Sequence, residues 1–67
     1  MKNIIRVERA IHNLTQADLA DKLDVSRQTI HAIENNKYVP STILALRMAR
    51  LFQKKVEEIF ILEKKDL

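Results

Sequence analysis

The chain has 67 residues, no cysteine and a formal net charge of +3 at pH 7, from 12 basic and 9 acidic residues. Its 46% hydrophobic and 31% charged content excludes wholesale disorder, and no apolar run approaches the roughly 20 residues of a membrane-spanning helix. We therefore expect one small domain over residues 1–67 in the cytoplasm, with no membrane partner and a basic balance that permits a polyanionic ligand.

The first predicted element is a helix over about residues 4–12. Ile4, Val7, Ile11 and Leu14 recur at the spacing of one helical face. The residues before this helix could be extended instead.

A second helix is predicted to begin after Thr15. The Thr15 hydroxyl can accept the free amide of Asp18, which supplies the acidic half of a shortened capping box. Leu14 and Leu19 stand at the positions of a hydrophobic staple. The helix is expected to stop at Asp24, in the left-handed conformation that Asp tolerates better than most residues.

A third helix follows after about three residues and is predicted to run to about Asn35. Ser26 is its expected N-cap, with Val25 and Ile30 as the staple pair. Ile30 and Ile33 should point inward. The opposite side then carries Arg27, Gln28, His31, Ala32 and Asn35, which are polar apart from Ala32.

Residues 35–40 are predicted to form a loop, because Asn36 suits a left-handed position and Pro40 prevents helical continuation through the residue before it. Ser41 should cap a fourth helix that runs to about Phe52. This helix is apolar around most of its circumference, which predicts a central place in the core. A short fifth helix is expected over about residues 56–60.

Two closely joined helices, the second with a polar face, form the geometry that inserts a helix into the major groove of DNA. The same pair also occurs in structural all-helical domains. Geometry alone therefore leaves DNA binding and a purely structural role open.

Three segments look like the helix-turn-helix of Xre/Cro-like repressors: Thr15-Gln16-Ala17-Asp18-Leu19-Ala20, Val25-Ser26-Arg27-Gln28-Thr29-Ile30 and Ala32-Ile33-Glu34-Asn35. The similarity continues through Lys37-Tyr38-Val39-Pro40-Ser41 and Val56-Glu57-Glu58-Ile59-Phe60. It implies an all-α, five-helix, lambda-repressor-like DNA-binding domain with its helix-turn-helix at about 15–35. It also implies a homodimeric transcriptional regulator, a repressor, that binds a palindromic operator.

The sequence departs from the family pattern at three places. Asp24 and Asn36 stand where the family prefers glycine, and both types are conformationally plausible there. Residues 53–55 replace a glycine-containing link, which removes the expected N-cap of the fifth helix and leaves its start open.

The resemblance assigns DNA contacts to the third helix and its surroundings. Arg27 can pair with guanine and Gln28 with adenine in the major groove, while His31 and Ala32 lie one turn later. The alternative for these side chains is a solvated helix face. Tyr38 could also pack against the fourth helix. The residues expected to contact phosphates are Gln16, Thr29, Asn36, Lys37 and Tyr38.

Arg9 and Glu34 match positions where this family commonly forms an ion pair between the first and third helices. A solvated pair would contribute only about 0–1 kcal/mol. The pair therefore matters only if it is partly buried and well aligned.

A homodimer is also expected from the thin core and from the apolar run near the end of the chain. The candidate interface residues are Val56, Ile59, Phe60, Ile61 and Leu62. Ile61 and Leu62 could in addition pair with Lys2-Asn3 in a small terminal β-sheet. The alternative is that the whole run packs inside one monomer.

Other classes of protein are weaker candidates. The sequence shows no nucleophile–base set and no glycine-rich phosphate loop, and neither His12 nor His31 has companions at metal-ligand spacing. We therefore expect no enzyme, metal or cofactor. The remaining alternative is an antitoxin or protein-interaction module with secondary DNA binding, which a neighbouring toxin gene would favour.

Overall fold

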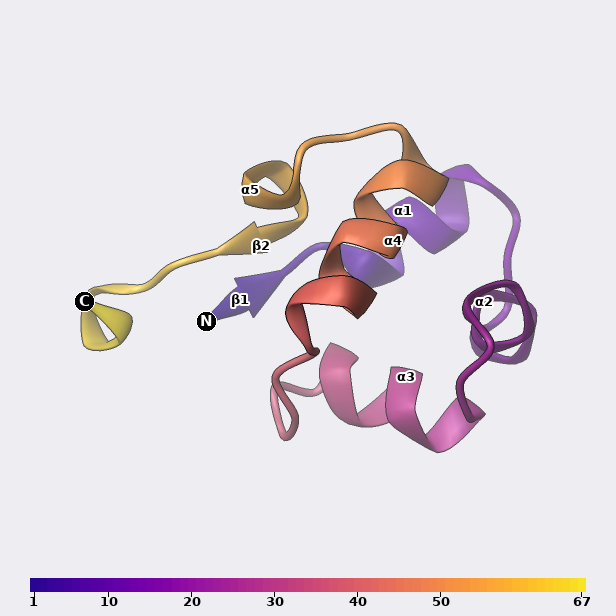
Figure 1. Cartoon of the computed structure of the whole chain (residues 1–67), viewed down its shortest axis with the longest axis horizontal. Helices are drawn as coiled ribbons and strands as arrows, with labels where there is room; N and C mark the ends of the chain where they lie inside the picture. Colours follow the sequence, from indigo (N-terminus) through magenta and orange to yellow (C-terminus); the bar gives the residue numbers. More distant parts are fainter.

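The computed structural model describes residues 1–67 and contains five helices and a two-stranded sheet, as predicted. In chain order the elements are β1 (Lys2–Asn3), α1 (Ile5–Ile11), α2 (Gln16–Leu23), α3 (Arg27–Glu34), α4 (Thr42–Phe52), α5 (Val56–Ile59), β2 (Phe60–Ile61) and the 3-10 turn η1 (Lys64–Asp66). Figure 1 shows α3 along one side of the molecule, next to α2, with the two strands at the opposite end from α2. No helix is long and apolar enough to span a membrane.

Three helices begin at the predicted capping residues. Thr15 Oγ1 accepts the Asp18 amide and Asp18 Oδ2 accepts the Thr15 amide, both at 3.0 Å, which completes the capping box of α2. The Ser26 and Ser41 hydroxyls each accept one amide of the first turn, of α3 and α4 respectively, at 3.1 Å. These local bonds satisfy amides that a helix leaves without partners, and they fix where α2, α3 and α4 begin.

The chain has no glycine, and four other residues adopt positive φ instead. The predicted left-handed positions at Asp24 and Asn36 are confirmed, with φ of 56° and 60°. Asn13 and Gln53, with φ of 55° and 56°, were not predicted. Gln53 ends α4 with its backbone amide directed at the Ala49 and Arg50 carbonyls, but its side chain forms no local hydrogen bond of the kind that favours Asn and Asp in this conformation.

The start of α5, which the sequence left open, is fixed by its own first turn. Glu58 Oε1 accepts the Lys55 amide at 3.0 Å. This is the reciprocal half of a capping box, and it makes the missing Ser or Thr unnecessary.

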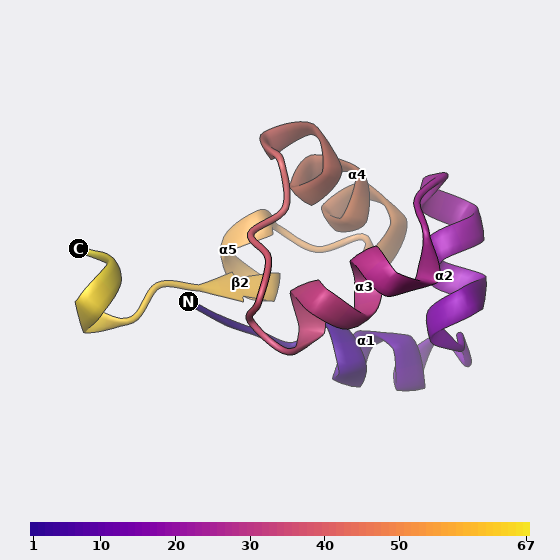
Figure 2. The same cartoon turned by 90° about the horizontal axis from the view of Figure 1, so that it is seen from below.

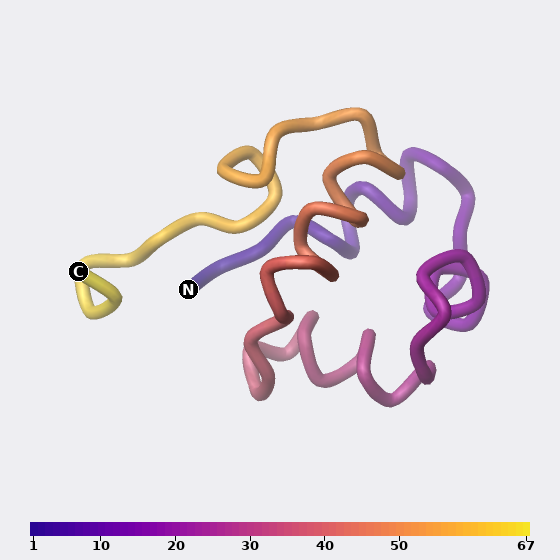
Figure 3. Tube along the Cα trace, viewed as in Figure 1, coloured from indigo at the N-terminus to yellow at the C-terminus, as the bar shows by residue number.

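The terminal sheet is antiparallel and pairs Lys2 with Ile61 and Asn3 with Phe60. The tube in Figure 3 shows these two ends of the chain side by side. The expected strand at residues 61–62 is one residue too late, because α5 has only four residues and the chain becomes extended at Phe60.

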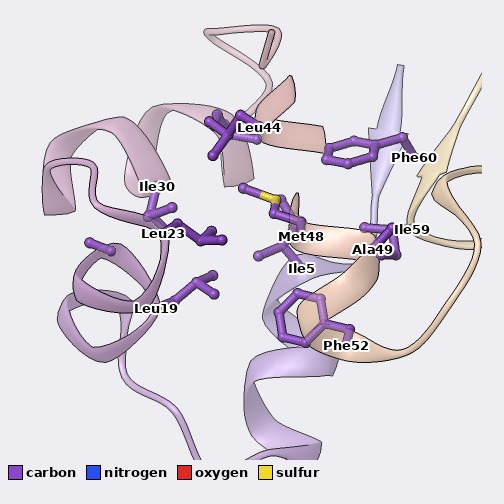
Figure 4. Packing of buried hydrophobic residues seen from close by; sticks show 12 residues of the cluster. Ile5, Leu19, Leu23, Ile30, Leu44, Met48, Ala49, Phe52, Ile59 and Phe60 are labelled. Carbon is purple, nitrogen blue, oxygen red and sulfur yellow. The ribbon is translucent and has the colours of Figure 1, made fainter. Parts of the chain in front are cut away.

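The core consists of buried apolar side chains from α1 to α5 and from β2. In Figure 4, Met48 of α4 lies between α2 and α3 on one side and Ile59 of α5 on the other. The central place predicted for α4 is thus correct. The cluster comprises Ile5, Leu19, Ala20, Leu23, Ile30, Ile33, Leu44, Met48, Ala49, Phe52, Ile59 and Phe60.

The face that α1 buries differs from the one its apolar spacing suggests. Val7 and Ile11 are 55% and 61% exposed, whereas Ile5 and Glu8 are buried. The apolar periodicity predicted the helix correctly but not its inner face. The buried carboxylate of Glu8 is paired with Lys54, which is distant in the sequence, so the local pattern does not reveal its burial.

Candidate nucleic-acid interface

The exposed side of α3 forms a polar cleft together with the start of α2. Gln16, Arg27, Gln28 and His31 line a cleft of about 240 Å³ that contains no hydrophobic residue. Figure 2 views the molecule from the side of α3, with α1 and α4 farther away behind it and α2 beside its N-terminal end. The structure thus brings together three of the four expected base-contacting residues and the side chain at the start of α2.

Ala32 and Thr29 are less available than their neighbours. Ala32 is half-buried. Thr29 is also half-buried, and its hydroxyl lies 2.9 Å from the Ser26 hydroxyl within the capped first turn. The inner side of the helix is apolar, with Ile30 and Ile33 fully covered by the core. The core therefore fixes which side of α3 faces outward.

A buried ion pair joins α1 to the end of α3. Arg9 Nε lies 2.6 Å from Glu34 Oε2 and Arg9 Nη2 lies 3.1 Å from Oε1, a bidentate arrangement around a carboxylate side chain that is 1% exposed. Arg9 Nη1 also donates to the Leu14 carbonyl. Burial raises the pKa of Glu34, but hydrogen bonds from Arg9 and Gln16 outweigh it and hold that pKa below its ordinary value. The pair thus meets both conditions, burial and alignment, under which it matters.

Gln16 and His31 continue this polar network to the surface. Gln16 Nε2 donates to Glu34 Oε1 at 3.2 Å and lies 3.5 Å from His31 Nδ1. Asn35 Nδ2 lies within 3.4 Å of both nitrogens of the same imidazole. Gln16 and His31, two of the four side chains of the cleft, are therefore connected to the Arg9–Glu34 ion pair.

The loop after α3 presents the expected phosphate-contacting residues on the surface. Asn36, Lys37 and Tyr38 are all exposed, Tyr38 by 50%. Asn3 of β1 holds this loop, because its Nδ2 donates to the Ile33 carbonyl at 2.9 Å and to Asn36 Oδ1 at 3.2 Å. Sequence reasoning missed Asn3, since nothing local in the sequence links it to residues so far along the chain.

Two further charged groups were also missed. Arg6 Nε lies 3.8 Å from Glu34 Oε1, with its side chain 72% exposed. Also at α1, Lys54 Nζ lies 2.9 Å from Glu8 Oε2, and this contact raises the pKa of Lys54. Glu8 Oε1 lies 3.8 Å from His12 Nε2 and has no hydrogen-bond partner.

The candidate dimer residues divide into two groups. Ile59 and Phe60 are 0% and 7% exposed and belong to the core of the monomer. For Ile59 this corrects the sequence expectation, because the packing of α5 against α4 leaves its side chain no exposed surface for a partner. Phe60 keeps a small exposed part. Val56 is half-buried, while Ile61 and Leu62 are 43% and 62% exposed.

Comparison with known proteins identifies the family. A family model described as helix-turn-helix matches residues 5–59. A protein of Methanocaldococcus jannaschii named as an HTH-type transcriptional regulator is 60% identical over 63 residues, which are 94% of this chain and 96% of that protein.

Two further relatives carry the same name of HTH-type transcriptional regulator. One from Archaeoglobus fulgidus is 43% identical over 100% of this chain and 94% of its own length. One from Bacillus subtilis is 41% identical over 98% of this chain and 100% of its own length. Together with the fold and the polar face of α3, these matches show that the chain belongs to the Xre/Cro-like helix-turn-helix family of DNA-binding transcriptional regulators.

Proposed function

We propose that residues 1–67 act as a helix-turn-helix domain that represses transcription by binding a palindromic operator as a homodimer. The observation that carries this proposal is the polar cleft of Gln16, Arg27, Gln28 and His31 on a helix whose other side is buried. A major groove of B-DNA is about 12 Å wide and admits one α-helix. In the bound state α3 lies in that groove with its N-terminal half toward the base edges.

Direct base contacts come from the exposed residues of α3. The guanidinium of Arg27 suits guanine O6 and N7, and the amide of Gln28 suits adenine N6 and N7, each worth about 1–3 kcal/mol of discrimination. One turn later, His31 supplies a ring nitrogen and Ala32 a methyl group for a thymine methyl. These roles follow from the exposure of Arg27, Gln28 and His31 beside one another.

Phosphate contacts position the protein without selecting sequence. Lys37 supplies a full charge, while the hydroxyl of Tyr38 and the polar groups of Thr29 and Asn36 supply hydrogen bonds. The loop that carries three of these residues is held against β1 through Asn3, which supports a fixed position beside α3.

A pair of variants separates these two kinds of contact. Gln28→Ala should relax specificity at one base position of the half-site. Lys37→Ala should weaken binding almost equally on specific and random duplexes and reduce the log–log salt slope by about one unit. Lys55→Ala, which removes the same charge from the exposed start of α5, should leave both quantities unchanged. If Gln28→Ala and Lys37→Ala both bound every duplex as the parent does, this surface would not be the DNA interface.

The size of the molecule and its exposed apolar surface support the proposed homodimer. The longest dimension is 32 Å, and recognition helices on successive half-sites stand about 34 Å apart, so one chain can occupy only one major groove. Ile61 and Leu62 are exposed, and a largely apolar groove of about 220 Å³ lies between α4 and α5. Its lining is formed by Met1, Val39, Pro40, Thr42, Ala45, Leu46, Val56 and Phe60.

A second copy of this chain is the occupant we assign to that surface. Ile43 and Leu46 of α4 are 71% and 55% exposed, so the apolar face of α4 continues from the core to the outside. A two-fold dimer buries such a self-complementary patch on both copies at once.

Sedimentation equilibrium tests the dimer. The parent should sediment as a dimer and the Leu62→Asp variant as a monomer. The Ile11→Asp variant should remain a dimer, although Ile11 is as exposed as Leu62, at 61% against 62%. Ile11 lies on α1, outside the groove and the C-terminal strand. A parent that stays monomeric at high micromolar concentration would remove the homodimer from the proposed function.

A further inference from the structure

Arg6 of α1 carries a positive charge that the fold leaves without a hydrogen bond. Its side chain is 72% exposed. The nearest carboxylate is that of Glu34, and the distance from Arg6 Nε to Glu34 Oε1 is 3.8 Å, which is longer than a hydrogen bond. A guanidinium has five N–H donors in a planar fork. All of these donors are therefore available to another molecule.

The Glu34 carboxylate does not need Arg6 as its cation. Arg9 donates to both Glu34 oxygens, at 2.6 and 3.1 Å, and Gln16 adds a third hydrogen bond at 3.2 Å. The single negative charge of Glu34 is thus balanced by Arg9 in a pair whose side chains are 1% and 15% exposed. Arg6 is the surplus positive charge of this cluster, and it is the member that lies at the surface.

Arg6 lies beside a residue of the proposed DNA interface. Gln16 Nε2 and Arg6 Nε approach the same oxygen, Glu34 Oε1, at 3.2 and 3.8 Å, so the two side chains are neighbours. Gln16 also lines the polar cleft on α3, and it is one of the residues expected to contact a phosphate. Duplex DNA carries one phosphate charge for about every 1.7 Å of its axis. A phosphate contact by Gln16 therefore brings the DNA backbone close to Arg6.

We propose that Arg6 contacts the phosphate backbone of DNA, which extends the interface from α2 and α3 to α1. A guanidinium matches two phosphate oxygens with parallel N–H donors, and its charge adds to these bonds. The proposal rests on the proposed function, since the backbone reaches Arg6 when α3 lies in the major groove. The alternative is a structural role, in which Arg6 acts only through Glu34 on the position of α3.

The salt dependence of DNA affinity tests the proposal, with the parent and Arg6→Met compared on the selected consensus duplex and on a random duplex. The variant should bind both duplexes about 5- to 10-fold more weakly at 0.1 M salt, because one phosphate contact is lost. The magnitude of its log–log salt slope should fall by about one unit. Its selected consensus should equal that of the parent, since phosphate contacts carry no sequence information.

Two further variants serve as controls. Arg6→Lys keeps the charge and should keep the salt slope of the parent. Arg50→Met removes the same group from α4, where Arg50 is exposed and lines a hollow with Lys22 and Arg47. This hollow shares no residue with the polar cleft. Arg50→Met should therefore leave both the affinity and the salt slope unchanged.

Three results would overturn the proposal. The first is an Arg6→Met variant with the affinity and salt slope of the parent. The second is a changed base preference with the salt slope of the parent, which would show that Arg6 acts through Glu34 on α3. The third is an equal fall of the slope in Arg50→Met, which would show a general effect of net charge. A parent that selects no consensus would instead contradict the proposed function, and that result is obtained before any variant is measured.

Discussion

Two neighbouring residues of α1, Glu8 and Arg9, form ion pairs with different partners, and the two pairs differ in geometry. Arg9 binds Glu34 of α3 through two hydrogen bonds and has a third at the Leu14 carbonyl. Glu8 has a single close cation, Lys54, whose Nζ lies 2.9 Å from Oε2, and neither Glu8 oxygen has a hydrogen bond of good geometry. Both carboxylates are buried, but only that of Glu34 is fully hydrogen-bonded.

This difference in geometry matches the elements that each ion pair joins. The Arg9–Glu34 pair joins α1 to the helix that carries the proposed base contacts, and a planar bidentate contact fixes direction as well as distance. The Glu8–Lys54 pair attaches the link between α4 and α5 to α1, where a single contact fixes position alone. Buried charges stabilise a fold weakly but penalise its disruption strongly. We therefore expect the first pair to affect both stability and DNA recognition, and the second to affect stability alone.

The largest expected effect comes from Arg9→Met, which leaves the Glu34 carboxylate buried without its cation. The free energy of unfolding should fall by about 3–5 kcal/mol in a denaturant titration. Arg6→Met removes a guanidinium from the same carboxylate, but that group is 72% exposed at 3.8 Å, so the loss should be about 0–1 kcal/mol. Equal losses in the two variants would mean that the bidentate geometry contributes nothing.

Lys54→Met should also destabilise the protein, by less than Arg9→Met. The Glu8 carboxylate loses its cation, but the Lys54 side chain is 37% exposed, so water can reach its place. Lys55→Met is the matched control, since Lys55 is exposed and forms no ion pair with Glu8. The midpoint of urea unfolding measures the stability of both variants, Lys54→Met and Lys55→Met. The base preference of folded Lys54→Met should equal that of the parent, and a changed preference would contradict the division of roles between the two pairs.

The smallest of these effects is a dependence on acidic pH. Because the pKa of Glu34 is lowered in the folded state, the unfolded chain binds more protons below the ordinary pKa of a glutamate. The stabilisation from Glu34 is fully present above that ordinary pKa and is lost as the pH falls through the folded-state pKa. Between about pH 5 and about pH 3, the parent should lose more free energy of unfolding than Glu34→Gln. Parallel curves would show that Glu34 has the same pKa in both states.

The fold was predictable where the determinants are local. Thr15, Ser26 and Ser41 mark helix starts through bonds that span three residues, and Asp24 and Asn36 supply turns in a chain without glycine. Such signals can be recognised in the sequence because both partners lie within one turn. The helix boundaries followed from them to within a residue or two.

The inner face of α1 was not predictable in the same way. Glu8 is buried and is paired with Lys54, which is distant in the sequence. Val7 and Ile11 are exposed although they repeat at helical spacing. Asn3 supports the end of α3 and the loop after it through contacts that are also distant in the sequence, to Ile33 and Asn36. The family resemblance indicated the Arg9–Glu34 pair, but nothing in the sequence predicts that Gln16 donates a hydrogen bond to Glu34.

The central claim is that α3 recognises base edges in DNA, and selection of bound duplexes from a random pool by the parent protein tests it most directly. We expect a palindromic consensus with half-site centres about 10 bp apart, which is one helical turn. Recovery of duplexes with no shared sequence, bound with the affinity of the unselected pool, would contradict the claim.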